Sequence, residues 1–386
     1  MIGRTPLVIA LGMAAAFVFA ADARGEAPPA SRPGVTVDAD GRLAKDGRPI
    51  RAIGVNYFSA FLRTLKSADD TSYDAGLAAL AEHKIPFARF AATGFWPADM
   101  NLYREDKAAY FQRMDAVVKA AERHGVGLVP SLFWHLPAVP DIVGEPCDQW
   151  GNPKSKTHEF MRTYTRELVT RYKDSPAIWG WEFANEYNLV ADLPNAASHR
   201  PQIVPKLGTP ETRSARDEFT HDILRTALSE FAREVRRHDP YRFITSGNSI
   251  PRASAWHNWK ERSWKADTPE QFAEMLAFEN PDPLNVLSIH TYNEALEKIP
   301  AAAEAAAHLK KPLFIGEFQV AGAAPDATEK AFRTVLERIE KSGAAIAAVW
   351  VYDLPMQEKE FNVTATNSRA WQLKAVAEAN RRLAGP

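Results

Sequence analysis

Two glutamates at matching places in an alternating pattern are the first candidates for chemistry in this sequence. Glu186 follows an apolar run that starts at Ile178, and Glu317 closes a second run that starts at Leu313. Two carboxyl groups that face each other can cleave an acetal, because one protonates the leaving oxygen while the other, ionised, attacks the carbon. Their surroundings must then push their pKa values apart. The pair predicts such chemistry if the fold brings the two glutamates together.

Polar and aromatic side chains stand at the ends of other short apolar runs. They could keep one carboxylate ionised, orient both carboxylates or form a floor under a ligand. This set comprises Arg89, His135, Asn185, His290, Tyr292 and Trp350. Each residue alone could equally be a structural ion pair, a core histidine or a packed aromatic ring, so their recurrence at equivalent positions carries the argument. The histidines show no helical metal-binding spacing, and we expect neither a catalytic metal nor a cofactor.

The elements that must position these residues alternate along the chain. Short runs rich in β-branched and aromatic residues predict strands at 51–57, 87–91, 127–134, 178–183, 242–246, 286–290, 313–317 and 345–352. Apolar residues spaced three and four apart predict helices at 75–83, 108–124, 157–172, 213–237, 270–278, 301–309, 327–342 and 370–383. Strict alternation of strand and helix indicates a parallel sheet covered by helices.

Eight such units predict a (β/α)8 TIM barrel, whose strand ends converge on one cleft. A doubly wound open sheet is the alternative, but Asn56, Tyr57 and Phe58 stand at the end of the first strand, where a glycine-rich phosphate loop would begin. Two Asp-Gly pairs within residues 38–47 predict an N-terminal β-hairpin before the barrel. Long loops follow the fourth and fifth strands, and both fall on the side where the strand ends meet.

Composition limits the remaining possibilities. An apolar run at 7–20 after Arg4 predicts a secretory signal peptide at 1–23, followed by a Pro-rich leader at 24–34 and one catalytic domain at 35–386. We therefore expect a secreted or periplasmic monomer that leaves the membrane after cleavage. The 47 basic and 48 acidic side chains are balanced, which excludes an electrostatic nucleic-acid binder. Cys147 is the only cysteine, and we interpret it as an inert loop thiol.

Three short motifs resemble those of glycoside hydrolase family 5. The run WEFANE at 181–186 resembles its Asn-Glu acid/base motif, FIGEF at 314–318 its nucleophile strand, and IHTY at 289–292 its His-x-Tyr motif. The positions of Arg89, His135 and Trp350 are similar to those of three further family residues. The segment HKIPFAR at 83–89 departs from the family's Gly-x-Asn-x-x-Arg pattern. Six elements in the right order span almost the whole chain after the leader.

The resemblance implies a retaining mechanism with Glu186 as acid/base and Glu317 as nucleophile. It further implies that Asn185 holds the sugar 2-hydroxyl and that Tyr292 donates to the nucleophile. The supporting network would be Arg89, His135 and His290, with Trp350 as the floor under the reacting sugar. Strand alternation places Glu182 deeper in the barrel than Glu186, so we interpret it as a buried network carboxylate.

The expected substrate is a β-linked glycan. The motifs favour a mannan-type over a glucan-type β-1,4 polymer, and an exo-acting glycosidase, a transglycosylase or a non-catalytic carbohydrate-binding barrel remain as alternatives. Aromatic rings bind the apolar faces of sugars, so we expect Trp96 and Trp134 to line the cleft. In the loop after the fifth strand, Trp256 and Trp259 either bind remote sugars or pack the loop onto the barrel.

Overall fold

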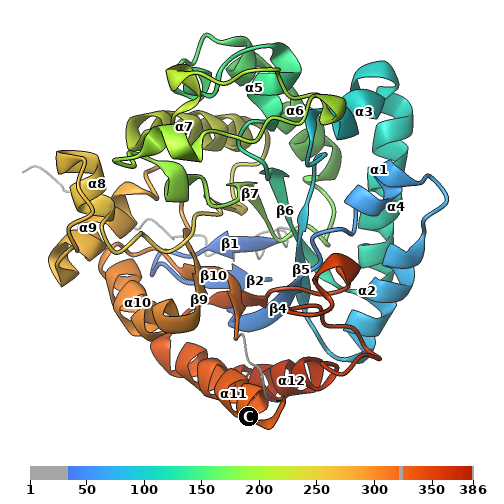
Figure 1. Ribbon diagram of the computed structural model, residues 1–386. Coiled ribbons are helices and arrows are strands. Elements are labelled where there is room, and N and C mark those ends of the chain that lie inside the picture. The colour runs from blue at the N-terminus through green and yellow to red at the C-terminus, as the bar shows by residue number, and fades with distance from the viewer. Residues whose placement is uncertain (1–33, 321–324, 385–386) are drawn as a thin grey trace, which may run out of the picture. The chain divides into compact units, whose positions relative to one another are not determined.

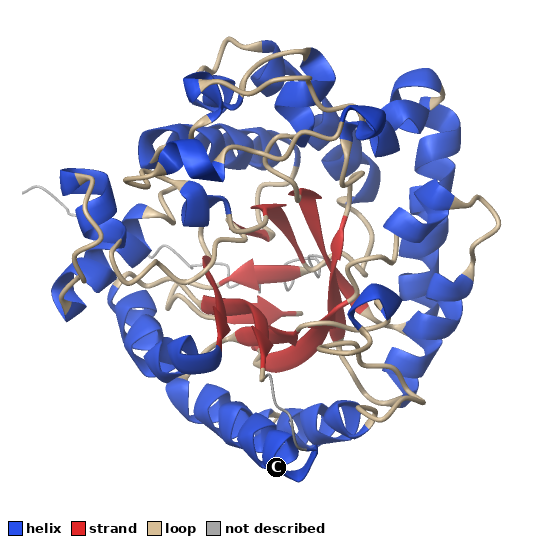
Figure 2. Ribbon diagram, viewed as in Figure 1, coloured by secondary structure: helices blue, strands red, loops and turns tan. Residues whose placement is uncertain are grey.

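The computed structural model describes residues 34–320 and 325–384, and a ring of helices surrounds a central parallel sheet in that part of the chain (Figures 1 and 2). The sheet has eight strands in the order β8-β7-β6-β5-β4-β11-β10-β9. The predicted (β/α)8 barrel is thereby confirmed. The expected signal peptide at 1–23 and all but Gly34 of the expected leader lie outside the described residues.

All eight predicted barrel strands are present, with bounds that agree within three residues. They are β4 (Ala52–Asn56), β5 (Phe87–Ala91), β6 (Gly127–Phe133), β7 (Gly180–Ala184), β8 (Phe243–Thr245), β9 (Leu287–Tyr292), β10 (Leu313–Gln319) and β11 (Ile346–Val349). Their side chains are buried on both faces, as expected for parallel strands enclosed by helices. Between the outermost strands, the carbonyl of Ile244 accepts from the backbone N–H of Asn285 and of Val286, both at 3.2 Å, which joins the two edges of the sheet.

Eight longer helices cover the barrel. They are α2 (Ser72–Glu82), α4 (Lys107–His124), α6 (Lys156–Tyr172), α7 (His221–His238), α9 (Pro269–Phe278), α10 (Ile299–His308), α11 (Pro325–Ser342) and α12 (Trp371–Leu383). The prediction that the helix before strand five begins at Arg213 is wrong. Thr220 accepts from the backbone N–H of Ile223 and caps α7 there, while Ser214 and Asp217 cap a separate short turn.

A small antiparallel sheet covers the N-terminal ends of the barrel strands. The predicted hairpin is β1 (Val35–Val37) paired with β2 (Leu43–Lys45), and β3 (Arg48–Pro49) extends it. Val35 and Leu43 pack in one buried cluster with residues at the beginning of several barrel strands, among them Phe87, Phe243 and Phe314. This sheet closes one end of the barrel, so the opposite end is left for chemistry.

The long connections at the C-terminal ends of the barrel strands contain most of the irregular structure. Residues 185–220, between β7 and α7, contain four short 3₁₀ turns, and residues 246–268 contain α8 (Ala255–Glu261). Shorter helices absent from the prediction are α1 (Leu62–Lys66), α3 (Asn101–Glu105) and α5 (Ala138–Val143).

Cys147 is buried, and burial raises the pKa of its thiol, in keeping with an inert role. Among the described helices, none has the length and apolar content needed to cross a membrane.

Candidate active site

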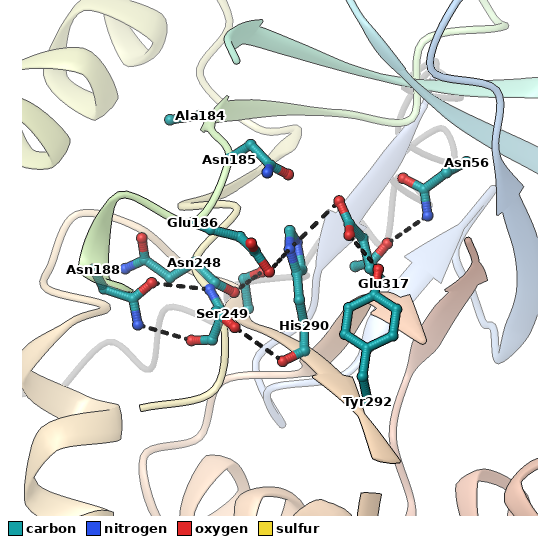
Figure 3. Close-up of polar contacts among 12 residues, drawn as sticks. Asn56, Ala184, Asn185, Glu186, Asn188, Asn248, Ser249, His290, Tyr292 and Glu317 are labelled. Atoms are coloured by element: carbon teal, nitrogen blue, oxygen red, sulfur yellow. Dashed lines mark hydrogen bonds and ion pairs between the residues drawn. The ribbon is translucent and has the colours of Figure 1, made fainter. Parts of the chain in front are cut away.

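Glu186 and Glu317 face each other at the C-terminal end of the barrel. Glu317 lies within β10, and Glu186 lies two residues beyond the end of β7. One carboxylate oxygen of each, together with Nδ1 of His290, lies within 4.8 Å of the other two. Figure 3 shows both carboxylates directed toward the His290 ring between them. Because the barrel strands converge at their C-terminal ends, two residues that are far apart in sequence lie close together here.

Both oxygens of Glu317 accept hydrogen bonds from strong donors. Nη1 of Arg89 lies 2.7 Å from Oε1, and the hydroxyl of Tyr292 lies 2.5 Å from Oε2. The carboxylate is buried, with 5% of its side chain exposed. An ionised carboxylate accepts at both oxygens, whereas a carboxylic acid must donate from one of them. This environment suits a carboxylate that acts as a nucleophile.

Glu186 lies in a different environment. Its backbone has φ = 56°, in the left-handed region, and its N–H donates to the carbonyl of Gly247 at 2.8 Å. Burial raises the pKa of its carboxyl group, and the charges of Arg89 and Arg252 and a hydrogen bond from Ser249 oppose that rise only in part. The two glutamates therefore differ in the way an acid and a nucleophile must differ.

His290 separates the two carboxyl groups and is uncharged. Its Nδ1 lies 3.2 Å from Oε1 of Glu186 and 3.5 Å from Oε1 of Glu317. Burial lowers the pKa of the imidazole to about 3. A β-carbon at Gly316 would lie 2.6 Å from Nε2 of His290, so only glycine leaves room for this ring. The neutral ring can orient Glu186 without adding a charge to the site.

Arg89 connects the site to three other strands. Its guanidinium donates to Glu182 at 2.6 Å, to Asn56 at 2.8 Å and to Asn185 at 2.9 Å, in addition to Glu317. It also lies over the ring of Trp134, 4.2 Å from the centroid. The structure thus places Arg89 in the site despite the unusual segment before it, and Glu182 is the buried network carboxylate expected from strand alternation.

Asn56 is a member of this network that the sequence analysis did not select. Its Nδ2 donates to the carbonyl of Gly316 at 2.9 Å, and its Oδ1 accepts from Arg89. It is fully buried at the end of β4, the first barrel strand. The same rule that selected the other strand-end residues could have found it.

A cleft of about 540 Å³ opens beside Glu186. Trp96 and Trp134 line it, as expected from the sequence, and so do His135 and Asn185. His135 stacks on Phe95 with ring centroids 4.3 Å apart, and burial lowers the pKa of its imidazole to about 4. His135 makes its hydrogen bond to the carbonyl of Phe95 at 3.0 Å, so it orients a cleft wall.

Trp350 packs against Trp134, the ring that Arg89 also contacts. Its ring stacks on that of Trp134 at 6.0 Å, and its Nε1 donates to Gln357 at 2.8 Å. The ring is therefore fixed at the end of β11, three strands of the sheet away from β6 and two from β9. The expected role of Trp350 as the floor of the reacting subsite stays a prediction.

The structure does not bring Trp256 and Trp259 into this site. Neither is among the residues that line the cleft. Nε1 of Trp256 donates to Glu274 at 2.9 Å, and the ring of Trp259 packs on Phe278 at 4.0 Å between centroids. Both partners belong to α9. Of the two interpretations that the sequence left open, these contacts favour packing of the loop onto the barrel. Binding of remote sugars by Trp256 and Trp259 stays untested, and truncation of Trp259 can decide between the two.

The segment after Glu186 is fixed by a second buried network. Nδ2 of Asn188 donates to Glu279 at 2.6 Å and to the carbonyl of Ser249 at 3.0 Å (Figure 3 shows the contact with Ser249). His221 bonds Glu279 at 3.1 Å and Asp192 at 2.8 Å. No motif in the sequence signals this network, because its members come from three separate connections and from the first residue of α7.

Glu186, His290 and Glu317 are close enough for their ligand atoms to surround a cation. Both oxygens of Glu317, however, already accept from Arg89 and Tyr292. A cation would also have to compete with the buried guanidinium charge of Arg89. The absence of a catalytic metal therefore stays a prediction, which chelation can test.

Comparison with known proteins agrees with this geometry. Residues 43–353 match the family described as Cellulase (glycosyl hydrolase family 5). A segment of 81 residues is 37% identical to the probable mannan endo-1,4-beta-mannosidase F of Neosartorya fischeri, covering 19% of this chain and 18% of that protein. A similar segment is 33% identical to mannan endo-1,4-beta-mannosidase A of Podospora anserina, covering 19% and 21%. The chain thus matches about a fifth of the length of these relatives.

Solved structures show the same fold at low identity. The endo-1,4-beta-mannanase of Rhizomucor miehei has a TM-score of 0.67 at 17% identity and covers 92% of this chain and 100% of its own. An exo-beta-1,4-mannosidase from Opitutaceae bacterium strain TAV5 has a TM-score of 0.62 at 16% identity, covering 90% and 63%. The barrel and its facing glutamates thus define a glycoside hydrolase. The family match extends over most of the chain, and the protein belongs to glycoside hydrolase family 5.

Proposed function

We propose that this protein is a retaining β-glycoside hydrolase in which Glu317 is the nucleophile and Glu186 is the acid/base. The observation that carries the proposal is the asymmetry of the two facing carboxyl groups. Glu317 accepts from two strong donors, whereas burial raises the pKa of Glu186. Oxygens of the two lie within 4.8 Å of each other, which suits the short carboxyl spacing of about 5–5.5 Å of retaining enzymes.

The proposed reaction has two steps. Glu317 attacks the anomeric carbon while Glu186 gives its proton to the leaving oxygen, and a glycosyl ester forms on Glu317. Glu186, now ionised, takes a proton from water as that water releases the sugar. We propose that Asn185, which accepts a hydrogen bond from Arg89 at 2.9 Å, holds the sugar 2-hydroxyl, and that Trp350 lies under the reacting ring.

The proposed substrate is a β-1,4-linked mannan-type polysaccharide or oligosaccharide. The support is that the matched relatives and the similar solved structures carry mannosidase or mannanase names. The similar structures include both an endo-acting and an exo-acting protein. We propose hydrolysis as the main reaction. Transfer to an acceptor sugar is the same chemistry when less water reaches the glycosyl ester. We further propose that the chain is an exported monomer, consistent with the apolar run at 7–20.

Proton NMR during hydrolysis of a mannan oligosaccharide tests the mechanism. The β-anomer should appear first, followed by slow mutarotation, whereas an initial α-anomer would refute retention. Glu317→Gln should abolish turnover, because an amide cannot form the glycosyl ester. Product sizing on mannan, glucomannan and a cellulose derivative tests the substrate class, and N-terminal sequencing of the exported protein tests cleavage of the signal peptide near residue 23.

A further inference from the structure

The cleft lies on one side of the reacting pair. Its lining includes Asn185 and Glu186 and continues through the segment that follows them, as far as Phe219. Glu317 does not line it. In the proposed function, the acid gives its proton to the oxygen of the leaving group, so the leaving group lies on the side of the acid. The cleft is therefore in the position of the leaving group.

Most charged side chains of this cleft are already paired or solvated. Arg200 forms an ion pair with Glu218, with Nε 2.9 Å from Oε1. Asp217 accepts from the backbone N–H of Ser214 at 2.8 Å and lies 3.5 Å from Arg213. His199 is exposed. These groups support the cleft wall, and none of the paired ones has a charge left for a ligand.

Arg252 differs from these residues. Its Nε donates to the carbonyl of Leu189 at 2.6 Å, which fixes the guanidinium plane. Within residues 34–320 and 325–384, its two terminal nitrogens have no hydrogen-bond or ion-pair partner. The side chain is half-buried and lines the cleft together with Glu186. Burial lowers the pKa of this guanidinium, and the charges of Glu186 and Glu279 favour its protonated form.

An arginine fixed at Nε presents its remaining donors in a preset plane. Such donors bond oxygen atoms with little loss of side-chain entropy on binding. Sugar hydroxyls supply oxygen acceptors, and aromatic rings supply surfaces for the apolar faces of sugars. Trp96 and the stacked pair of Phe95 and His135 line the same cleft. The cleft thus combines a free polar group with aromatic surface.

We propose that this cleft binds the sugar of the leaving group and that the terminal nitrogens of Arg252 donate hydrogen bonds to its hydroxyl oxygens. This inference rests on the proposed function. It adds that Arg252 distinguishes a sugar leaving group from a leaving group without hydroxyls. Arg252 also binds the acceptor sugar in transfer reactions, because the acceptor enters where the leaving sugar was. The reacting subsite beside Glu317 does not depend on it.

Two substrates with different leaving groups test the proposal. Mannopentaose leaves with a sugar, whereas 4-nitrophenyl β-mannobioside leaves with an aryl group that has no hydroxyls for Arg252. Arg252→Gln should lower kcat/KM by about 10-fold or more on mannopentaose, the usual effect of losing a charged hydrogen bond. Turnover of the aryl substrate should fall by less than about 3-fold, because Arg252 affects it only through the weak influence of its charge on Glu186. With the aryl donor and added mannobiose, the yield of transfer product should also fall.

Two further variants keep the test decisive. Arg225→Gln is the matched control, because Arg225 also donates to one backbone carbonyl, that of Phe278, but belongs to the outer helix α7. It should leave the ratio of the two activities unchanged. Arg252→Lys keeps the positive charge but lacks the planar guanidinium with its several donors, so it should lose part of the activity on mannopentaose. This variant provides the test if Arg252→Gln fails to fold.

Equal losses on both substrates, with a lower melting temperature, would overturn the proposal in favour of a structural role. Unchanged activity of folded Arg252→Gln on mannopentaose would overturn it as well. A failure of the proposed function would be distinct, because the unaltered protein would then turn over neither substrate, and the inference would fall with it.

Discussion

The hydroxyl of Tyr292 donates to Oε2 of Glu317 at 2.5 Å, from the strand next to that of the glutamate. The parallel register pairs Gln319 with Tyr292 and Glu317 with His290, so both residues of the β9 strand end reach the same carboxylate. In the proposed mechanism, Glu317 becomes a leaving carboxylate when the glycosyl ester breaks. A donor fixed at this distance stabilises the negative charge that returns to it.

Replacing Tyr292 by Phe should therefore lower kcat by about 10- to 100-fold, the range expected for a hydrogen bond to a charged group. The effect should fall mainly on breakdown of the glycosyl ester, so a burst of nitrophenol from an aryl substrate should become visible. Tyr103→Phe is the control, because it removes a tyrosine–glutamate hydrogen bond of 2.7 Å on α3, outside the site. An unchanged kcat in Tyr292→Phe would contradict the stabilising role.

Removal of the acid should separate substrates by their leaving groups. Glu186→Ala should slow mannan oligosaccharides severely and aryl glycosides with good leaving groups much less, because the latter need little proton donation. Added azide should restore turnover of the aryl substrate and give a β-glycosyl azide. Glu304→Ala, on the exposed face of α10, should change neither activity. Equal losses on both substrates without azide rescue would count against Glu186 as the acid.

The site should work without a metal ion. Glu186, His290 and Glu317 offer three possible ligand atoms, but Arg89 and Tyr292 already satisfy Glu317. Dialysis against a chelator should leave kcat and the melting temperature unchanged, and added divalent cations should not increase activity. A loss of activity that a specific cation reverses would show that this group binds a metal.

His221 should make the stability of the protein depend on pH. Burial opposes its charge, but hydrogen bonds to Asp192 and Glu279 and their negative charges outweigh burial and raise its pKa from 6.5 to about 9. The folded state then binds the proton more tightly than the unfolded state. The resulting stabilisation is complete below about pH 6.5 and is lost as pH rises through about 9, at about 1.4 kcal/mol per pKa unit.

Melting temperatures of the unaltered protein and of His221→Gln test this dependence. At about pH 6 the unaltered protein should melt at a higher temperature than His221→Gln. The difference between the two melting temperatures should narrow by about pH 10, where the histidine is neutral in both the folded and the unfolded state. His308→Gln is the control, because that side chain is 75% exposed on α10 and should show no such trend. A difference that stays constant across this pH range would refute a charged His221.

Two tryptophans should respond in opposite ways to truncation. Trp350→Ala should lower activity on long and short substrates alike, because we expect its ring to form the floor under the reacting sugar. Trp259→Ala should lower the melting temperature and leave substrate preference unchanged, because its ring packs on Phe278. Because Trp259 is only half-buried, the loss of stability should be smaller than the about 3–5 kcal/mol of a fully packed tryptophan. A selective loss on long oligosaccharides would instead place Trp259 in a binding subsite.

The alternating pattern was sufficient to predict the barrel and the convergence of its strand ends. Arg89, His290 and Tyr292 were predicted because each lies within or just after a short apolar run, a local property that the sequence displays. Trp256 and Trp259 were ambiguous, because a loop's composition does not say which neighbour it packs against. Their partners on α9 follow only from the path of the chain.

The network of Asn188, His221 and Glu279 could not be predicted for the same reason. Asn188 and Glu279 lie in separate connections, His221 begins α7, and none of the three ends a strand. The same limit applies to Arg252, whose significance depends on the pairing of its neighbours and on a carbonyl of the preceding connection. Residues placed by the barrel's symmetry can be found from sequence, whereas residues placed by individual loops require the structure.

The small sheet that closes the barrel also affects the order in which the domain assembles. Val35 and Leu43 are made early, but their partners include Trp179, Phe314 and Ile346, which enter the chain much later. Contacts between such distant residues form slowly, because closing a long loop costs chain entropy before any contact is gained. The β1–β3 segment therefore cannot complete its buried cluster until the last barrel strand is in place, which links the first part of the domain to be synthesised with the last.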